Sequence, residues 1–375
     1  MNWDTGLGFE RWHQAKKLGL TKEALIGLAQ DDTLGLPGRT RRWAKHMLDR
    51  GLLFYERLAQ REGGIPAPVF FGVRASPQGP PSARLAAARM EANAARAIAA
   101  GLGEAASSAP PPLFAYDPDT GRLAVTTPHY NTAVVPVNQR AFPYGGIELA
   151  RLFDRDQDVA GAVAGTAPAA FGLVVRDGAG RRVLATQTGR SQAAGTAPVR
   201  LMRAPHLARA TAARRPGRVF AGPFGALKAT GTMSASGLLA RTTHTFTRRT
   251  ITTSWSLTRR GGSRALTASA KFPSHGPKAA IEVTLRDARS LRLGRTPVAL
   301  ARVRSIAVRS NDSGYSVVPR RAPRGASITA VAVRAQSSAL QPGPSLAVRL
   351  ATDATWRSAR LTARLTVRPE LALAD

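Results

Sequence analysis

The hydrophobic pattern of this chain changes its period near residue 113. Before this point apolar residues recur at helical spacing, and after it they alternate with polar residues, as in strands. Side chains repeat every 3.6 residues in a helix and every two in a strand. At 375 residues the chain is long enough for two domains. The sequence therefore predicts an α+β fold, with a helical segment over residues 1–105 and an antiparallel β-sandwich over residues 113–375.

Helical spacing is clearest over residues 39–62 and 82–103. Thr21 is placed to cap a helix over K-E-A-L-I-G-L-A, Ser82 to cap the later helix, and Gly101 to end it. These helices are too few to close a helical barrel. We therefore interpret the segment as part of a helical toroid, and expect further helices N-terminal to it.

The strand-like half contains two clear hairpin signals. L-F-A-Y-D-P-D-T-G-R-L-A-V-T-T-P turns at D-P-D-T-G, and F-G-L-V-V-R-D-G-A-G-R-R-V-L-A-T turns at D-G-A-G. The segment G-I-E-L-A-R-L-F-D fits either one helical turn or a strand, and residues 190–216 are predicted as an Arg-rich loop. Later short strands alternate Thr, Ser and Arg with Val, Ile, Leu and Ala, which is typical of a sandwich with one wet face.

Positive charge is concentrated in the second half of the chain. Residues 161–375 hold 35 of the 54 basic residues and only 7 of the 23 acidic ones, in a chain of net charge +31. Such a field attracts polyanions: acidic polysaccharide, anionic cell-wall polymer, nucleic acid or a membrane surface. A solvated basic surface shaped by codon bias is the alternative, because most of the basic residues are Arg. Codon bias alone does not explain why acidic residues become rare in the second half.

Several classes of chemistry are excluded or disfavoured by missing motifs. The chain has no Cys, which excludes disulfides, thiolate catalysis and Cys-ligated metal sites. It also lacks a P-loop, a G-x-G-x-x-G after a strand, a G-x-S-x-G elbow and an H-E-x-x-H helix. We therefore predict no cofactor and no metal.

The start of the chain carries two further expectations. The first residues already show the spacing of a helix, and no signal peptide is visible before them. No stretch of the chain is long and apolar enough to span a membrane. We interpret the chain as the C-terminal part of a longer protein, or as one whose start has been misassigned. If an export signal has been lost with the missing part, the protein is expected outside the cell or at its surface.

A polar cluster over residues 126–146 is the first candidate for catalysis. It includes His129, Tyr130, Asn131 and Arg140 in T-T-P-H-Y-N-T-A-V-V-P-V-N-Q-R. His and Tyr can transfer protons, while Asn and Arg can polarise or neutralise a carboxylate. On a strand, His129 and Asn131 would share one face and Tyr130 would take the other. The alternative is a buried Tyr and a hydrogen-bonded His with only structural roles.

A second group of candidates lies at the beginning of the chain. Asn2, Trp3, Trp12 and His13 fit one helical face of a sugar-binding cleft, although tryptophans in a hydrophobic core explain the same pattern. His244, in T-T-H-T-F, is placed to reach the interface between the domains, or is an ordinary strand histidine.

The combination of helices, sandwich and polar cluster resembles the (α/α)-toroid polysaccharide lyases, of the heparinase-II/III-like or alginate-lyase-like kinds. The segments that carry the resemblance are N-W-D-T-G-L-G-F-E-R-W-H, T-T-P-H-Y-N-T-A-V-V, T-T-H-T-F-T-R-R-T-I and G-Y-S-V-V-P. The resemblance implies β-elimination on a uronate-containing polymer. It further implies Tyr130 as acid/base, His129 as base or neutralising group, and Asn131 and Arg140 as carboxylate contacts. Most of the toroid, with the helix that usually supplies a catalytic Asn or Tyr, is absent from this chain.

Three functions remain in competition at this point. The first is a polysaccharide lyase-like protein that acts on acidic glycan. The second is a non-catalytic module that binds anionic glycan or cell-wall polymer through the basic sandwich. The third is nucleic-acid binding. Two features argue against it: strands dominate the basic half, and no platform of interleaved basic and aromatic residues occurs. Non-specific contact with nucleic acid through the Arg-rich surface is nevertheless compatible with the charge.

Overall fold

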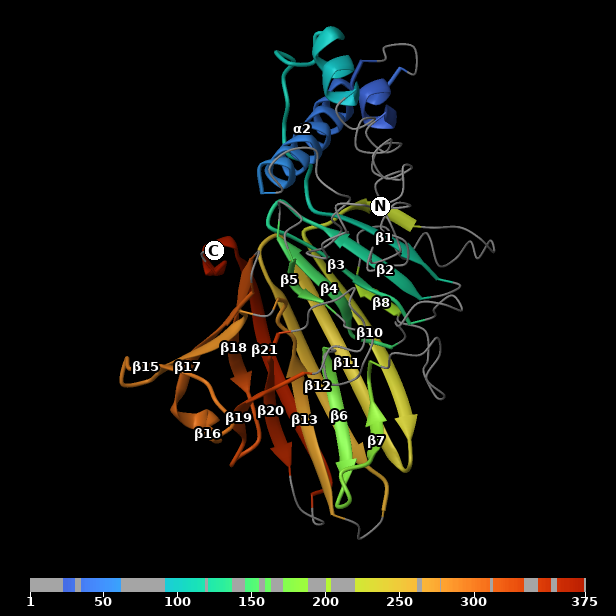
Figure 1. The fold of residues 1–375 in the computed structure, drawn as a ribbon. Coiled ribbons are helices and arrows are strands. Elements are labelled where there is room, and N and C mark those ends of the chain that lie inside the picture. Colours follow the sequence, from blue (N-terminus) through green and yellow to red (C-terminus); the bar gives the residue numbers. More distant parts are fainter. Residues whose placement is uncertain are drawn as a thin grey trace, which may run out of the picture. The chain divides into compact units, whose positions relative to one another are not determined.

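The computed structural model describes residues 23–30, 35–61, 92–118, 121–136, 146–154, 159–162, 171–187, 200–203, 220–261, 265–276, 278–310, 313–333, 343–351 and 356–373. The chain divides into two compact units, residues 6–111 and residues 112–375. The first is helical in its described parts and the second is built of strands (Figure 1). None of the helices in the described ranges is both long and apolar enough to cross a membrane.

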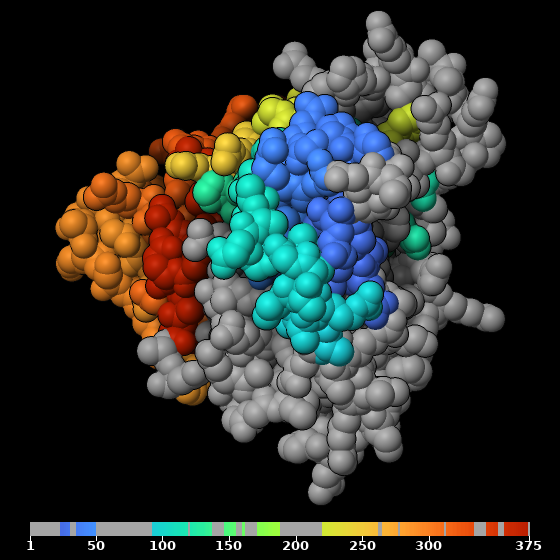
Figure 2. Space-filling view, turned by 90° about the horizontal axis from the view of Figure 1, so that it is seen from above, coloured from blue at the N-terminus to red at the C-terminus, as the bar shows by residue number. Residues whose placement is uncertain are grey.

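The helical unit is organised around helix α2 (Gly38–Arg61), close to the predicted range. Leu48 packs with Ile26, Ala97 and Leu102 in a small buried cluster. Figure 2 shows residues 92–106 (cyan) beside residues 35–49 (blue) in this unit. These contacts explain the helical spacing, because residues four apart face the same neighbour.

Gly101 ends the helix that covers residues 92–99, as predicted. Its φ of 71° lies in the left-handed region that glycine tolerates best. The backbone N–H of Leu102 donates to the carbonyl of Ala97, and that of Gly101 to Ile98, which satisfies carbonyls at the end of the helix. The predicted start of this helix at Ser82 lies outside the described residues.

The second unit contains three antiparallel sheets. Sheet 1 has the order β5-β4-β3-β2-β1-β9, formed by β1 (Leu113–Asp117), β2 (Arg122–Thr126), β3 (Tyr130–Val134), β4 (Leu149–Asp154), β5 (Val159–Ala162) and β9 (Phe220–Pro223). Sheet 3 has the order β16-β19-β20-β13-β6-β7, formed by β6 (Gly172–Asp177), β7 (Arg182–Ala185), β13 (Leu266–Phe272), β16 (Val298–Ala299), β19 (Ser327–Val331) and β20 (Ser345–Ala351).

Sheet 2 is the largest, with nine strands in the order β15-β14-β17-β18-β21-β12-β11-β10-β8. Its strands are β8 (Arg200–Arg203), β10 (Ala226–Ala235), β11 (Leu238–Thr247), β12 (Ile251–Arg259), β14 (Ala280–Leu285), β15 (Ser290–Arg292), β17 (Val303–Arg309), β18 (Gly314–Arg321) and β21 (Ser358–Arg368). Two short 3₁₀ turns, η2 (Leu300–Arg302) and η3 (Pro369–Leu371), complete the described elements. The strand β8 corrects the prediction of a loop over residues 190–216.

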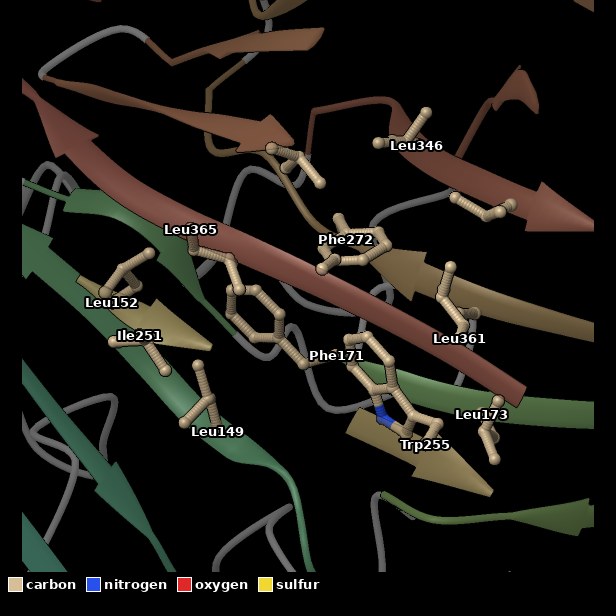
Figure 3. Packing of buried hydrophobic residues seen from close by; sticks show 14 of the residues in the cluster. Leu149, Leu152, Phe171, Leu173, Ile251, Trp255, Phe272, Leu346, Leu361 and Leu365 are labelled. Atoms are coloured by element: carbon tan, nitrogen blue, oxygen red, sulfur yellow. The ribbon is translucent and has the colours of Figure 1, made fainter. Parts of the chain in front are cut away.

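One continuous hydrophobic core joins the three sheets. It includes Leu149 from sheet 1, Trp255 from sheet 2 and Phe272 from sheet 3. Trp255 and Phe272 meet edge to face, with ring centroids 5.5 Å apart (Figure 3). Sheets 1 and 3 therefore cover the inner face of sheet 2, and Figure 1 shows β6 and β7 in the layer in front of β10, β11 and β12.

The prediction of a β-rich α+β fold with antiparallel sheets is confirmed. Both predicted hairpins form, as β1–β2 and β6–β7. The ambiguous segment G-I-E-L-A-R-L-F-D forms strand β4. The partial toroid stays a prediction.

Candidate functional site

Tyr130 begins strand β3 and points into the core. The hydroxyl of Thr127 accepts hydrogen bonds from the backbone N–H groups of His129 and Tyr130, at 3.1 and 2.9 Å, in a tight turn before the strand. The Tyr130 side chain is 1% exposed, and its hydroxyl donates to the backbone carbonyl of Thr247 at 2.7 Å. Tyr130 thus ties the start of β3 in sheet 1 to the end of β11 in sheet 2.

This environment suits a structural tyrosine better than a proton carrier. Burial raises the pKa of the Tyr130 hydroxyl well above its usual value, because the charged phenolate is poorly solvated in the core. A catalytic base needs a pKa near the working pH and access to the proton that it removes. The acid/base role of Tyr130 stays a prediction, and its burial argues against it.

His129 and Asn131 flank Tyr130 and are both half-buried. The Asn131 amide donates to the backbone carbonyl of Asp154 at 3.5 Å, across the β3–β4 pair. Their predicted roles as neutralising group and carboxylate contact stay predictions. Four other predicted residues, Asn2, Trp3, His13 and Arg140, lie outside the described residues.

Sequence reasoning missed Arg151 on strand β4. In the β3–β4 register Asn131 stands opposite Phe153, and Ala133 opposite Arg151, so all four residues share one face of sheet 1. The guanidinium of Arg151 lies over the Phe153 ring, 5.3 Å from its centroid. Alternation along β4 would have placed Arg151 and Phe153 on one face, had the segment been assigned as a strand.

His244 lies in the core rather than on a surface. It is 1% exposed, on the inward face of β11. Its Nε2 is 3.0 Å from the carbonyl of Ile147, which can only accept, so Nε2 carries the proton. Nδ1 then accepts from the hydroxyl of Thr253, at 3.0 Å. Both ring nitrogens are occupied, which disfavours the predicted substrate contact.

Glu148 is the second ionisable group of this buried cluster. Its side chain is 0% exposed and accepts hydrogen bonds from the Trp255 indole N–H, at 3.0 and 3.1 Å, and from the Thr242 hydroxyl, at 2.6 Å. The His244 Nε2 is 3.8 Å from a Glu148 oxygen. Glu148 immediately precedes β4 of sheet 1, while its donors come from β11 and β12 of sheet 2.

Burial lowers the pKa of His244, and the Glu148 charge and the Ile147 carbonyl oppose this effect. A neutral histidine agrees with the hydrogen bonds described above. The cluster holds two titratable groups, but neither is open to solvent. We therefore interpret it as a polar joint between sheets rather than a catalytic site.

The outward face of sheet 2 has a different character. Strand pairing aligns outward residues of β10, β11, β12 and β21 into three rows. The rows are Thr232–Arg241–Ser256–Arg360, Thr230–Thr243–Ser254–Thr362 and Lys228–Thr245–Thr252–Arg364. We call these residues the hydroxyl–arginine face. It is the wet face of Thr, Ser and Arg that the alternation predicts.

Among the residues that the structure describes, the four strands of the hydroxyl–arginine face carry cations and no carboxylate. The sequences of β10, β11, β12 and β21 contain no Asp or Glu. Arg241 and Arg360 are exposed, two strands apart and therefore separated by about 10 Å along the sheet. The hydroxyls of Thr230 and Thr243 bond each other at 3.1 Å. Hydroxyls and guanidinium groups together form an array that can bind anionic groups.

The helical unit contains a small pocket of about 180 Å³ lined by Ala29, Gly38, Arg41, Arg42, Lys45, Leu102, Ala105 and Ala106. The Lys45 ammonium within it is bonded to the Asp49 carboxylate at 2.6 Å. The lining residues that the structure describes offer no nucleophile paired with a base. Within the described ranges, no three His, Asp or Glu side chains gather in a way that could hold a metal ion.

No family model matches this sequence, and no curated protein is detectably similar to it. Among solved structures, the heparan sulfate lyase HepC from Pedobacter heparinus is 8% identical, with a TM-score of 0.44 over 97% of this chain and 63% of that one. A heparinase III is 6% identical, with a TM-score of 0.40 over 76% of this chain and 41% of that one.

A 4-alpha-glucanotransferase from Thermococcus litoralis is also similar, at 9% identity and a TM-score of 0.42, over 94% of this chain and 49% of that one. The chain thus spans less than two thirds of the length of each of these structures. One of these proteins is a lyase and another is a transferase, so these distant similarities do not define one activity.

Proposed function

We propose that this protein binds an acidic polysaccharide through the hydroxyl–arginine face of sheet 2. The observation that carries the proposal is the alignment of Arg241, Arg360, Arg364 and Lys228 with rows of Thr and Ser on four strands that contain no acidic residue. A polymer that carries carboxylate or sulfate groups supplies the missing negative charge, and its hydroxyls match the Thr and Ser rows.

The chemistry of this face favours polysaccharide over nucleic acid. Proteins that hold single-stranded nucleic acid combine cations with aromatic rings on which bases stack. The three rows contain no aromatic residue. Stacking on neutral sugar rings is disfavoured for the same reason, so charge and hydrogen bonding must dominate. The face needs no catalytic group, and the proposal holds for a binding module and for a lyase alike.

We expect the triple substitution Arg241→Gln, Arg360→Gln and Arg364→Gln to weaken binding to heparan sulfate about tenfold to a hundredfold. Each charge contributes a modest amount, and the three charges on one face act together on one polymer. Affinity chromatography and isothermal titration calorimetry over a salt series measure the change, because screening must reduce the affinity of the unaltered protein as well.

A matched control separates this face from the overall charge. The triple Arg292→Gln, Arg295→Gln and Arg324→Gln removes the same charge from exposed arginines outside the four strands. We expect it to change the affinity less than threefold. Equal losses in the two triples would show that net charge alone attracts the polymer and would overturn the proposal.

Cleavage by β-elimination is the second candidate function. It is favoured by Asn131 and Arg151 on one face of sheet 1, although the Arg151 side chain is buried. These are the residue types that neutralise a uronate carboxylate. Incubation with heparan sulfate, alginate, chondroitin and hyaluronan, followed by the ultraviolet absorbance of unsaturated uronates, tests it directly. A flat trace with all four polymers would remove this candidate and leave the binding proposal intact.

If the protein cleaves any of these polymers, we expect Tyr130→Phe to change the initial rate less than tenfold. Its hydroxyl is bonded to the Thr247 carbonyl inside the core, where it cannot reach a substrate. The substitution should instead lower the free energy of unfolding by about 1 kcal/mol, the usual contribution of such a hydrogen bond. A rate loss of about 10²–10⁴ with an unchanged fold would restore Tyr130 as the acid/base.

A further inference from the structure

Strand β21 carries a regular pattern that runs through the hydroxyl–arginine face and beyond it. Its last nine residues, 360–368, read R-L-T-A-R-L-T-V-R. Leu361, Ala363 and Leu365 are buried in the core, so the residues that alternate with them point outward. We call these outward residues the β21 line: Arg360, Thr362, Arg364, Thr366 and Arg368.

The three arginines of the β21 line are evenly spaced. They are four residues apart, so neighbouring arginines are separated by about 14 Å, and Arg360 and Arg368 by about 27 Å. Arg360 and Arg368 are exposed, and Arg364 is half-buried. On the adjacent strand β18, Arg321 stands opposite Thr362 and adds an exposed cation beside the line.

The strands that flank β21 mostly place short side chains beside this line. β12 lies on one side of β21 and β18 on the other (Figure 1). The neighbours opposite the line include Ser256, Ser254 and Thr252 on β12, and Val318, Ser316 and Gly314 on β18. Neither flanking strand contains Asp or Glu.

One carboxylate lies close to the end of the β21 line. Glu370 pairs with Arg368 at 3.2 Å, but both side chains are more than half exposed to solvent. Exposed ion pairs of this kind are weak. An anionic ligand can therefore take the place of Glu370 at Arg368 at little cost.

Cations are sparser in the direction across the strands. Over β10, β11, β12 and β21, the row through Arg360 contains one other cation, Arg241, and the row through Arg364 contains Lys228. The row between them, which contains Thr362, has no cation on these four strands. A linear polyanion binds best when its axis follows the line with the most cations, because each contact after the first forms at high effective concentration.

We propose that the ligand of the hydroxyl–arginine face is an internal stretch of a linear, extended polyanion that lies along β21. Its anionic groups contact the three arginines of the β21 line, and its hydroxyls contact the two threonines between them. A guanidinium group forms paired hydrogen bonds with a carboxylate or sulfate group, so each arginine can hold one such group. This inference rests on the proposed binding of acidic polysaccharide, and it specifies which part of the polymer is bound and in which direction.

A chain end or a single small anion does not fit this arrangement, because about 27 Å separates Arg360 from Arg368. Heparan sulfate oligosaccharides of increasing length, titrated calorimetrically into the whole chain, test this point. We expect the affinity to rise about tenfold or more until the extended oligosaccharide spans about 27 Å, and to change little beyond that length. An affinity that does not depend on length would overturn the proposal.

The double variant Arg360→Gln, Arg368→Gln removes both outer cations of the β21 line. It should weaken binding of the longest oligosaccharide about tenfold or more, but binding of the shortest less than about threefold, because a short oligosaccharide occupies one arginine at a time. Equal losses for short and long oligosaccharides would contradict the proposal. Circular dichroism and the unfolding midpoint verify that the variant is folded.

A matched pair of substitutions separates the direction along β21 from the charge of the face as a whole. Lys228→Gln with Arg241→Gln removes the same charge from β10 and β11. Its loss of affinity for the longest oligosaccharide should be at least about threefold smaller than that of Arg360→Gln with Arg368→Gln. Equal losses in the two double variants would show that the polymer is not aligned along β21.

Failure of this inference differs from failure of the proposed function. If the Arg241, Arg360 and Arg364 triple variant loses no more affinity than its control triple, the face does not bind polysaccharide and both proposals fail. If the triple variants differ as expected but the two double variants lose affinity equally, the face binds the polymer without the alignment along β21, and only this inference fails.

Discussion

Replacing Glu148 with alanine is expected to lower the free energy of unfolding by about 3–5 kcal/mol, a large part of the total stability of an ordinary domain. The change should appear as a lower midpoint in urea unfolding, with little change in the slope. It should be the most destabilising of the single substitutions of carboxylates within the described strands and their flanks.

The physical reason is the number of buried groups that depend on one carboxylate. The Trp255 indole N–H and the Thr242 hydroxyl both donate to Glu148, and both would lose their acceptor in a site that water does not reach. A buried donor without a partner costs about 1–3 kcal/mol, and the cavity left by the side chain adds to that. Glu148→Gln keeps the volume and one acceptor oxygen, so its effect should be intermediate.

Glu282→Ala is the matched control for this substitution. The Glu282 carboxylate forms an ion pair with the Arg309 Nε at 2.9 Å, but its side chain is 45% exposed. An exposed pair of this kind contributes less than about 1 kcal/mol. If Glu148→Ala were no more destabilising than Glu282→Ala, the interpretation of Glu148 as the joint between the sheets would be wrong.

The parts of the fold that the sequence predicts well are those set by local patterns. Helix α2, the β1–β2 hairpin and the glycine that ends the helix at residue 101 depend on residues close to one another in the chain. The alternation of Thr, Ser and Arg likewise predicts the wet face of sheet 2. The alternation does not predict the order of the strands in the sheet, and it is this order that aligns Arg241 of β11 with Arg360 of β21.

The buried cluster could not be derived in the same way. Thr242 lies 94 residues from Glu148 and Trp255 lies 107 residues from it, so only the packing of sheets 1 and 2 brings them together. His244 shares its strand parity with Ala240 and Phe246, which are buried. Alternation along β11 therefore predicts that His244 points inward. In a Thr-rich strand a polar residue is easily assigned to the solvent-exposed face, because the polar composition of the strand suggests exposure more strongly than the alternation suggests burial.

The interpretation of Tyr130 shows the same limit at a candidate site. Tyr130 and Val134 lie on the same face of β3, which predicts that Tyr130 points into the core, while the neighbouring His129 and Asn131 suggest a polar site. The partner that decides between the two, the carbonyl of Thr247, is 117 residues away. Residue types that can perform catalysis are therefore weak evidence until the strands that carry them have been paired.

Replacing Gly172 with alanine is expected to lower the free energy of unfolding by about 3–5 kcal/mol. Gly172 has a φ of 106°, a conformation that side chains other than glycine rarely adopt, which costs about 1–3 kcal/mol. A Cβ at this position would also overlap the Cγ of Glu148 and the hydroxyl of Thr186, which sit in a closely packed core. Overpacking of this kind adds about 1–3 kcal/mol.

Gly178→Ala is the control for Gly172→Ala, because a Cβ at Gly178, in the β6–β7 turn, meets no atom within 4 Å. We expect its effect on the free energy of unfolding to stay below about 1 kcal/mol. The double variant Gly172→Ala, Glu148→Ala provides the sharper test. Truncating Glu148 removes one of the two groups that the new Cβ would strike, so the two losses should fall short of additivity by at least about 1 kcal/mol. Strict additivity would show that Gly172 and Glu148 do not share one packed site, and would contradict the role of Glu148 at the joint between the sheets.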